Sequence, residues 1–257
     1  MGVTISNGVV MLPLVILLGA VVGSFLNVCI DRLPERQSLF RPRSHCPACQ
    51  QRLAISDLIP VFSYLWLRGR CRYCGAPIPQ RLFWVELATA LLFSFLWWSY
   101  SPGVQLGILA AYGCLFIVIF VIDLERGLIL NRLVYPAALV TLALVPLRPE
   151  LTIINSLIGG GFGLVLLLLP AIVFRGGIGW GDVKMAGLIG LAIGSPIVFI
   201  AIVSSIIGGG LIAGILLLLS VKKRGDTIPF GPFLCLGAMA GLLWGSNIYD
   251  WYIGLFL

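Results

Sequence analysis

Charged residues are scarce in this sequence. Asp, Glu, Lys and Arg together make up 11% of the 257 residues, whereas 60% are hydrophobic. Soluble domains carry roughly a quarter charged residues, so the composition excludes an ordinary soluble protein. The apolar runs are about 20 residues long and do not alternate with polar residues, which favours spanning helices over a barrel. We therefore expect an all-α polytopic membrane protein.

The features of a cleaved signal peptide are also missing. No Lys or Arg precedes the first apolar run, which extends from about Val9 to Ile30, and no A-x-A cleavage site follows it. The run is also too long for the core of a typical signal peptide. We expect it to remain as the first membrane span.

Turn residues such as Ser195-Pro196 separate a series of apolar segments. The sequence thus predicts eight transmembrane helices, at residues 9–30, 82–100, 103–123, 128–147, 152–174, 183–194, 196–221 and 231–249. The sixth segment is short and interrupted by glycine. We expect it to be tilted, re-entrant or continuous with the seventh.

The basic residues predict the orientation of these spans. If residues 31–81 are cytoplasmic, 16 of the 17 Lys and Arg residues fall on that side and Arg148 alone falls outside. Besides nine arginines in 31–81, this set contains Arg126, Arg132, Arg175, Lys184, Lys222, Lys223 and Arg224. The positive-inside rule then gives both chain ends an external location. Because this rule accounts for the net charge of +7, we expect contact with membrane lipid and no nucleic-acid partner.

The segment 31–81 contains two C-x-x-C pairs, Cys46–Cys49 and Cys71–Cys74, with 21 residues between them. This spacing is typical of a zinc site with four thiolate ligands. Two disulfides are the alternative, which a reducing cytoplasm disfavours. Four cysteine ligands leave no open position for water, so the predicted zinc ion is structural. We expect His45, the only histidine, to be a surface neighbour.

Two acidic residues are predicted to lie at the cytoplasmic boundary. Asp123 ends the third predicted span, and Asp182 opens the sixth within the stretch GGIGWGDVK, residues 176–184. Each has a structural alternative, because Asp182 suits a helix N-cap and Asp123 stands where a span ends. Two carboxyl groups brought close together share a proton and can activate water against a peptide bond. Gly179 and Gly181 are expected to leave room for a substrate backbone.

Two further charged residues have simpler interpretations. We expect Glu86, one turn into the second span, to form an ion pair with Arg81, with lining of the active-site cavity as the alternative. Lys184 is expected to extend its ammonium group toward the membrane interface.

Several motifs, taken in order, resemble the bacterial prepilin peptidases over nearly the whole chain. They are GSFLNVCIDRLP (23–34), the C-x-x-C pairs, SDLIPVFSYLWLRGRCRYC (56–74), VELATALLF (85–93), IDLERGLILNRLVYP (122–136), GGIGWGDVK (176–184) and IPFGPFL (228–234). The chain departs from the family at Leu130 and Asn131, where many members have Pro and Asp.

The resemblance implies an aspartic peptidase of the GxGD type in the inner (cytoplasmic) membrane, with Asp123 and Asp182 as its catalytic pair. Its substrates would be prepilins and pseudopilins, whose short basic leader is cut after a glycine at the cytoplasmic face. The expected division is a first transmembrane helix (1–30), a zinc loop associated with methyl transfer (31–81) and a peptidase domain (82–257).

The resemblance also implies N-methylation of the new amino terminus with S-adenosylmethionine. No glycine-rich motif for this cofactor follows a strand, so the sequence does not identify its binding residues. Gly23, Ser24 and Asn27 are candidates for substrate binding or methyl transfer, with helix packing as the alternative. The competing hypotheses are a peptidase with a purely structural loop, a transporter, and a scaffold of a secretion machine.

Overall fold

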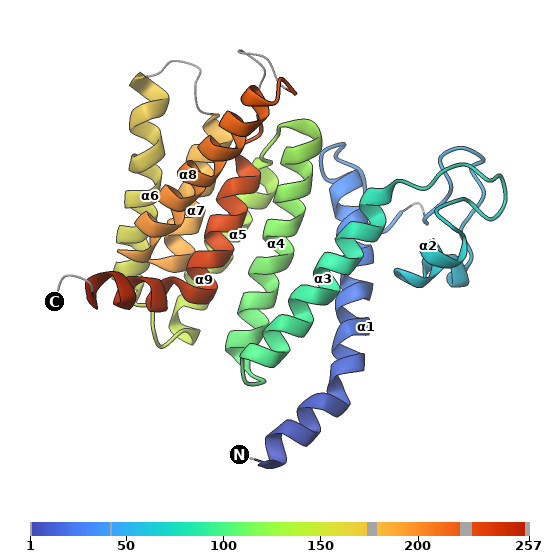
Figure 1. Cartoon of the computed structure of the whole chain (residues 1–257), viewed down its shortest axis with the longest axis horizontal. Helices are drawn as coiled ribbons and strands as arrows, with labels where there is room; N and C mark the ends of the chain where they lie inside the picture. Colours follow the sequence, from blue (N-terminus) through green and yellow to red (C-terminus); the bar gives the residue numbers. More distant parts are fainter. Residues whose placement is uncertain (1, 42, 174–178, 222–227, 255–257) are drawn as a thin grey trace. The chain divides into compact units, whose positions relative to one another are not determined.

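The computed structural model describes residues 2–41, 43–173, 179–221 and 228–254 (Figure 1). These residues form helices and connecting loops, and no strand occurs among them. The chain divides into two compact units, residues 1–118 and 119–257. Each unit is described by itself below.

Every predicted span coincides with a helix. These helices are α1 (Gly2–Arg32), α3 (Gln80–Ser99), α4 (Val104–Arg126), α5 (Asn131–Leu144), α6 (Ile153–Val173), α7 (Trp180–Ile193), α8 (Ile197–Leu218) and α9 (Gly231–Gly254). Among the described residues, six helices are long and apolar enough to cross a membrane, and α5 and α7 are not among them. The 14 residues of α7 extend about 21 Å, less than the ~30 Å of a hydrocarbon core. The protein is therefore a multi-pass membrane protein. The predicted eight spans exceed the six helices that are long and apolar enough among the described residues.

In the first unit, α1 and α3 pack side by side (Figure 1). A Cβ atom added at Gly23 would lie 2.7 Å from the Glu86 Cα, and one added at Gly19 would lie 2.8 Å from the Ala90 Cα. Small residues at these positions therefore let the two backbones approach closely. The Asn27 side-chain amide donates a hydrogen bond to the Leu82 carbonyl oxygen at 3.0 Å. Gly23 and Asn27 thus serve the packing of the two helices.

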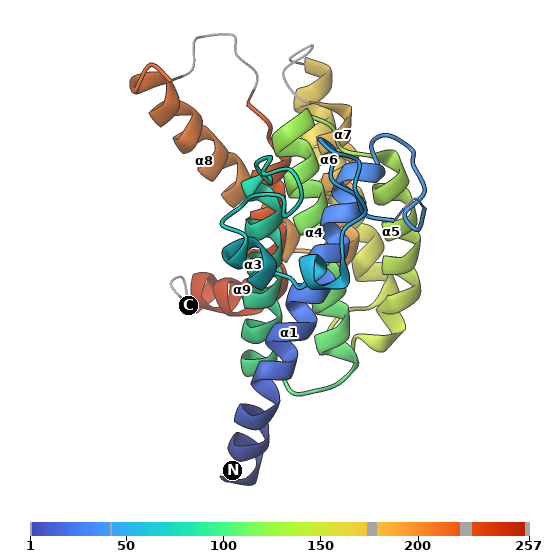
Figure 2. The same cartoon turned by 90° about the vertical axis from the view of Figure 1, so that its right-hand side faces the viewer.

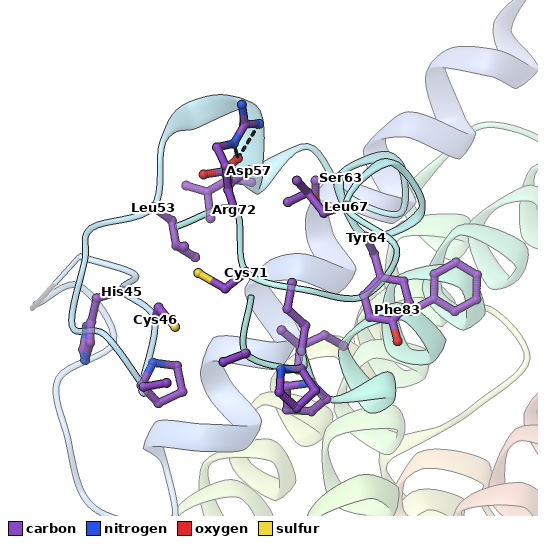
Figure 3. Close-up of a pocket in the computed structure, with 18 of the residues that line it drawn as sticks. His45, Cys46, Leu53, Asp57, Ser63, Tyr64, Leu67, Cys71, Arg72 and Phe83 are labelled. Atoms are coloured by element: carbon purple, nitrogen blue, oxygen red, sulfur yellow. Dashed lines mark hydrogen bonds and ion pairs between the residues drawn. The ribbon is translucent and has the colours of Figure 1, made fainter. Parts of the chain in front are cut away.

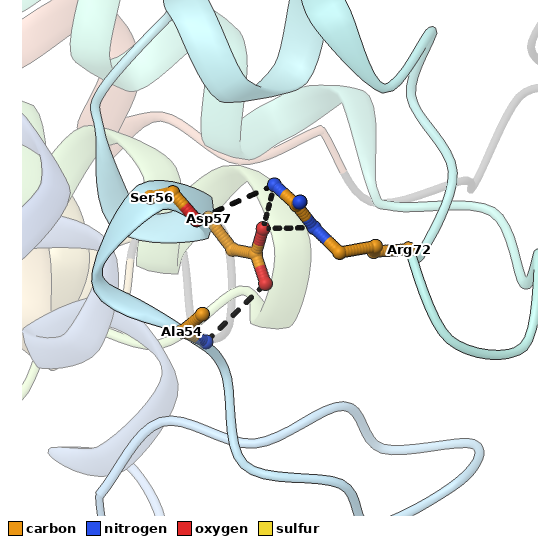
Figure 4. A network of polar contacts seen from close by, with 4 residues as sticks. All are labelled: Ala54, Ser56, Asp57 and Arg72. Atoms are coloured by element: carbon orange, nitrogen blue, oxygen red, sulfur yellow. Dashed lines mark hydrogen bonds and ion pairs between the residues drawn. The ribbon is translucent and has the colours of Figure 1, made fainter.

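The loop between α1 and α3 contains a short 3-10 helix (Ile55–Leu58) and the five-residue helix α2 (Phe62–Trp66). Figure 4 shows the polar contacts that hold it. The Asp57 carboxylate accepts hydrogen bonds from the Arg72 Nε at 2.7 Å and from the Ala54 backbone N–H at 3.2 Å. The Asp57 side chain is 4% exposed, so this ion pair is shielded from water on one side. It fixes the second C-x-x-C pair to the first half of the loop.

The second unit is built around α7, which packs against α5, α6 and α9. Nine of its 14 residues are buried. Glycines make the contact with α6 close: a Cβ atom added at Gly190 would overlap the carbonyl oxygen of Gly159. By contrast, the C-terminal end of α8 lies apart from α6 (Figure 2). Because other helices enclose α7, the position of its first turn, which contains Asp182, is fixed by contacts within the protein.

Candidate active site

Asp123 lies in the last turn of α4 and is 5% exposed. One carboxylate oxygen accepts a hydrogen bond from the Gly231 backbone N–H at 2.9 Å. Gly231 is the first residue of α9, so the carboxylate faces the positive end of that helix. A Cβ atom added at Gly231 would lie 2.6 Å from the same oxygen. The position therefore requires glycine for the carboxylate to approach the backbone.

Asp182 lies in the first turn of α7 and is half-buried. The N-cap residue is Gly179, so Asp182 is the third helical residue, and the alternative that Asp182 is itself the N-cap does not hold. Its side chain reaches back and accepts a hydrogen bond from the Gly179 backbone N–H. This contact is the acidic half of a capping box. Residues 176–178, the beginning of the glycine-rich stretch, lie outside the described residues.

The structure brings the two aspartates together within the second unit. The Asp123 carboxylate is close enough to Asp182 for electrostatic repulsion between them. The buried thiol of Cys235, one turn into α9, is within electrostatic range of both carboxyl groups. Three helix ends therefore converge on one place. Close carboxyl groups cannot both be ionised without a large cost, so such a pair holds a proton.

The start of α7 is held by contacts with the connection from α4 to α5. A Cβ atom added at Gly181 would lie 2.8 Å from the Ile129 Cβ, so this glycine allows α7 to pack against that connection. The Lys184 ammonium group donates a hydrogen bond to the Asn131 side chain at 3.1 Å and lies 5.6 Å from the centre of the Tyr135 ring. Lys184 thus bonds to the first residue of α5, and its extension toward the membrane interface stays a prediction.

Gly179 and Gly181 both have close neighbours within the chain. Atoms of the chain itself fill the space beside them, since the Asp182 carboxyl lies 3.0 Å from a Cβ built on Gly179 and Ile129 covers Gly181. Both glycines make room for the close packing of α7 and of the Asp182 carboxyl group, and the expected space for a substrate backbone stays a prediction.

The C-x-x-C pairs of the first unit adopt matching turns. The Gln50 N–H donates to the Cys46 carbonyl oxygen at 2.8 Å, and the Gly75 N–H donates to the Cys71 carbonyl oxygen at 2.9 Å. Gln50 and Gly75 both have positive φ, 58° and 72°. Each turn points its two sulfurs to the same side, as expected for a metal-binding pair.

The four sulfurs form a cluster that could hold a metal ion. The Sγ atoms of Cys46, Cys49, Cys71 and Cys74 all lie within 4.8 Å of one another, and all seven cysteines of the chain are free. Cys46 and Cys74 are 3.8 Å apart. A tetrahedral ion with metal–sulfur bonds of about 2.3 Å separates its sulfurs by about the same distance.

Hydrogen bonds affect the sulfurs of the cluster differently: the neighbouring cysteines raise the pKa of the Cys74 thiol, whereas that of Cys46 is lowered. The backbone N–H groups of Cys49 and Ala48 lower the pKa of the Cys46 thiol to about 6, so that sulfur favours the thiolate form that binds metals. His45 is exposed, and its Nδ1 lies 3.2 Å from the Arg43 carbonyl oxygen, away from the cluster. The residues present therefore fit a four-sulfur metal site.

The predicted ion pair between Glu86 and Arg81 is wrong. Arg81 pairs with Asp31 at 2.7 Å, and Glu86 accepts a hydrogen bond from the Val61 N–H at 2.7 Å. Glu86 lies five residues after Arg81, a spacing that places the two side chains on different faces of α3, and the partner of Glu86 comes from the loop. No local pattern in the sequence indicates this contact.

The comparisons with known proteins agree with this arrangement. Residues 17–100 match the bacterial peptidase A24 N-terminal domain, and residues 110–214 match the type IV leader peptidase family. A prepilin leader peptidase/N-methyltransferase from Aeromonas hydrophila is 33% identical over 95% of this chain and 94% of its own length. Proteins of the same name from Bacillus subtilis and Pseudomonas aeruginosa are 29% and 30% identical, covering 96% and 93% of this chain and 100% and 92% of their own lengths.

No solved structure matches the chain. The two family matches together include both C-x-x-C pairs, Asp123 and Asp182. The relatives match over nearly their whole length as well as that of this chain, so the likeness is not confined to one domain. The chain belongs to the type IV leader peptidase family.

Proposed function

We propose that this protein is a membrane aspartic endopeptidase that removes the leader peptide of type IV prepilins and pseudopilins and then N-methylates the new amino terminus. We place it in the inner membrane with its active site on the cytoplasmic side. The observation that carries the proposal is the convergence of Asp123 and Asp182 at adjoining helix ends. The names of the relatives, prepilin leader peptidase/N-methyltransferase, support both activities.

In the proposed reaction the two aspartates hold one proton between them. The ionised carboxylate takes a proton from a water molecule, whose oxygen attacks the peptide carbonyl carbon. The protonated carboxyl group donates a hydrogen bond to the carbonyl oxygen and supports the developing charge. The carbon–nitrogen bond then breaks, and the departing amine receives a proton from the pair. The Gly231 N–H keeps the Asp123 carboxylate oriented throughout.

We propose that the four-cysteine cluster binds one zinc ion with a structural role. The described residues between 33 and 79 form no strand and only short helices. A segment of this size buries too little apolar surface to be stable alone, and a bound metal can supply the missing free energy. The closed shell of four sulfurs leaves no ligand position for water.

The purified protein should contain about one zinc ion per chain. Cys71→Ser should reduce this content to well below half, because three thiolates bind zinc more weakly than four. Metal analysis by mass spectrometry measures the content, with Cys114→Ser as the control because Cys114 lies outside the cluster. An unchanged zinc content in Cys71→Ser would show that the ligand set is different.

The test of the proposed function is an assay that separates its two reactions. The purified full chain is incubated with a prepilin and with S-adenosylmethionine labelled in its methyl group. We expect both a shortened product and label at its amino terminus, read by gel mobility and by scintillation counting. Cleavage without label would leave a peptidase with a purely structural loop, and absence of both would support a transporter or scaffold instead.

A further inference from the structure

A cavity lies within the first unit, between the cysteine loop and the helix pair α1 and α3. It has a volume of about 200 Å³, within about 970 Å³ of empty space that includes its open mouth. Its lining residues include Ser24, Cys46, Tyr64, Cys71, Phe83 and Glu86. Figure 3 shows Cys46 and Cys71 at one side of the cavity and the rings of Tyr64 and Phe83 at the other. Cys46 and Cys71 of the four-cysteine cluster bound one side of this space, and the aspartate pair belongs to the other unit.

The cavity holds a buried acid that forms no ion pair with any residue that the structure describes. Glu86 is 8% exposed and lines the cavity. Its carboxylate accepts hydrogen bonds from the Val61 N–H and from the Ser24 side chain. No ion pair with Glu86 occurs in the part of the chain that the structure describes. A buried carboxylate without an opposite charge is unfavourable, so its environment suits a cationic ligand.

The hydrogen bond to Glu86 depends on an unusual backbone conformation. Val61 has φ 63° and ψ −51°, which is rare for a β-branched residue. Such conformations persist where surrounding contacts impose them, and they are concentrated at ligand-binding sites. Here the conformation directs the Val61 N–H at Glu86 just before α2 begins. The loop is thus built to hold this carboxylate in place.

The wall across the cavity from Cys46 and Cys71 offers aromatic surface (Figure 3). The Tyr64 and Phe83 rings have centroids 5.3 Å apart and planes tilted by 33°. Such a pair can accept a flat heteroaromatic ring by stacking and can also attract a cation. The cavity therefore combines a buried anion with an aromatic wall.

We propose that this cavity binds S-adenosylmethionine, with the Glu86 carboxylate facing the sulfonium group and the Tyr64–Phe83 wall contacting the adenine ring. The inference rests on the proposed methyltransferase function and gives it a site. The donor is a sulfonium cation with a flat heteroaromatic base, so its two parts match the two features of the cavity. The enclosed volume accommodates one end of the molecule, and the mouth accommodates the rest.

The charge on the sulfur atom predicts that the cavity distinguishes the methyl donor from its product. S-adenosylmethionine has a positively charged sulfur, whereas S-adenosylhomocysteine, which has lost the methyl group, has a neutral thioether. Glu86 should therefore favour the charged molecule over the neutral one. The same preference would retain the donor before methyl transfer and release the product after it.

The experiment measures binding of both molecules to the purified full chain by equilibrium dialysis, without any methyl transfer. Glu86→Gln keeps the size of the side chain and removes its charge. We expect it to weaken S-adenosylmethionine binding on the order of 30-fold, as for the loss of one partner of a buried charge pair, and S-adenosylhomocysteine binding by less than about threefold. Glu150→Gln, at an exposed position, should change neither.

A lower zinc content or a changed elution volume would reveal that Glu86→Gln is misfolded. A second variant, Tyr64→Leu, tests the same site independently. Tyr64→Leu should weaken binding of both molecules about tenfold, because a stacking ring contacts them equally. Equal effects of Glu86→Gln on the two ligands would overturn the role of Glu86, and unchanged binding in both variants would overturn the site. If the wild-type chain bound neither molecule and transferred no label, the proposed methyltransferase function itself would fail.

Discussion

Asp123→Asn and Asp182→Asn should each abolish prepilin cleavage in membranes while the protein still accumulates. Asparagine has nearly the size of aspartate but can neither take a proton from water nor share one with its neighbour. General acid–base catalysis contributes about 10²- to 10⁴-fold to a rate, so we expect a loss of at least about 10³-fold. In the Asp123→Asn variant the side-chain amide oxygen would still accept the Gly231 hydrogen bond, which is why the fold should survive.

The matched control for this prediction is Glu125→Gln. Glu125 lies two residues beyond Asp123 on α4, is exposed, and loses the same charge. Cleavage by this variant should stay within about twofold of wild type, as for an ordinary surface substitution. Immunoblotting of the membranes measures accumulation, and the ratio of shortened to full-length prepilin measures cleavage. Full activity of either asparagine variant would refute the dyad.

Gly231→Ala should lower cleavage strongly although it leaves both aspartates in place. The added methyl group would lie 2.6 Å from an Asp123 carboxylate oxygen and 2.9 Å from its carbon, so the carboxyl group must move. Displacing a catalytic group by about 1 Å can cost 10²-fold in rate. We expect a loss of about this size in kcat.

The control for Gly231→Ala is Gly210→Ala, since a Cβ atom at Gly210 on α8 meets no other atom within 4 Å. Both variants should accumulate, because alanine favours helices more than glycine does. Kinetic assays with a prepilin peptide compare the two. Cleavage by Gly231→Ala at the wild-type rate would indicate that Asp123 does not need its bond to α9.

The agreement between the predicted apolar spans and the observed helices has a simple cause. A membrane span is a local property, since about 20 apolar residues in a row meet the thickness of the bilayer whatever the rest of the chain does. Turn residues between the runs are local as well. The exception is the counting of segment 183–194 as a span: the 14 residues of α7 are enclosed by other helices, and burial of this kind does not depend on local hydrophobicity.

The metal cluster was predictable for a similar reason. Two residues of each C-x-x-C pair lie on one turn, so half of the ligand set is determined by spacing alone. The orientation of the chain remains a prediction from the positive-inside rule. Four of the basic residues on which it depends, Arg175, Lys222, Lys223 and Arg224, lie outside the described residues. The division of the chain into a first helix (1–30), a zinc loop (31–81) and a peptidase domain (82–257) likewise remains a prediction.

The sequence by itself determined that the chain is a helical membrane protein, that the spacing of four cysteines suits a metal ion, and that Asp123 and Asp182 are the acids to examine. The tertiary structure alone decided their surroundings. The Gly231 amide is 108 residues from Asp123, and Val61 is 25 residues from Glu86. Contacts over such separations depend on how whole helices pack, and local periodicity, capping and spacing carry no information about that packing.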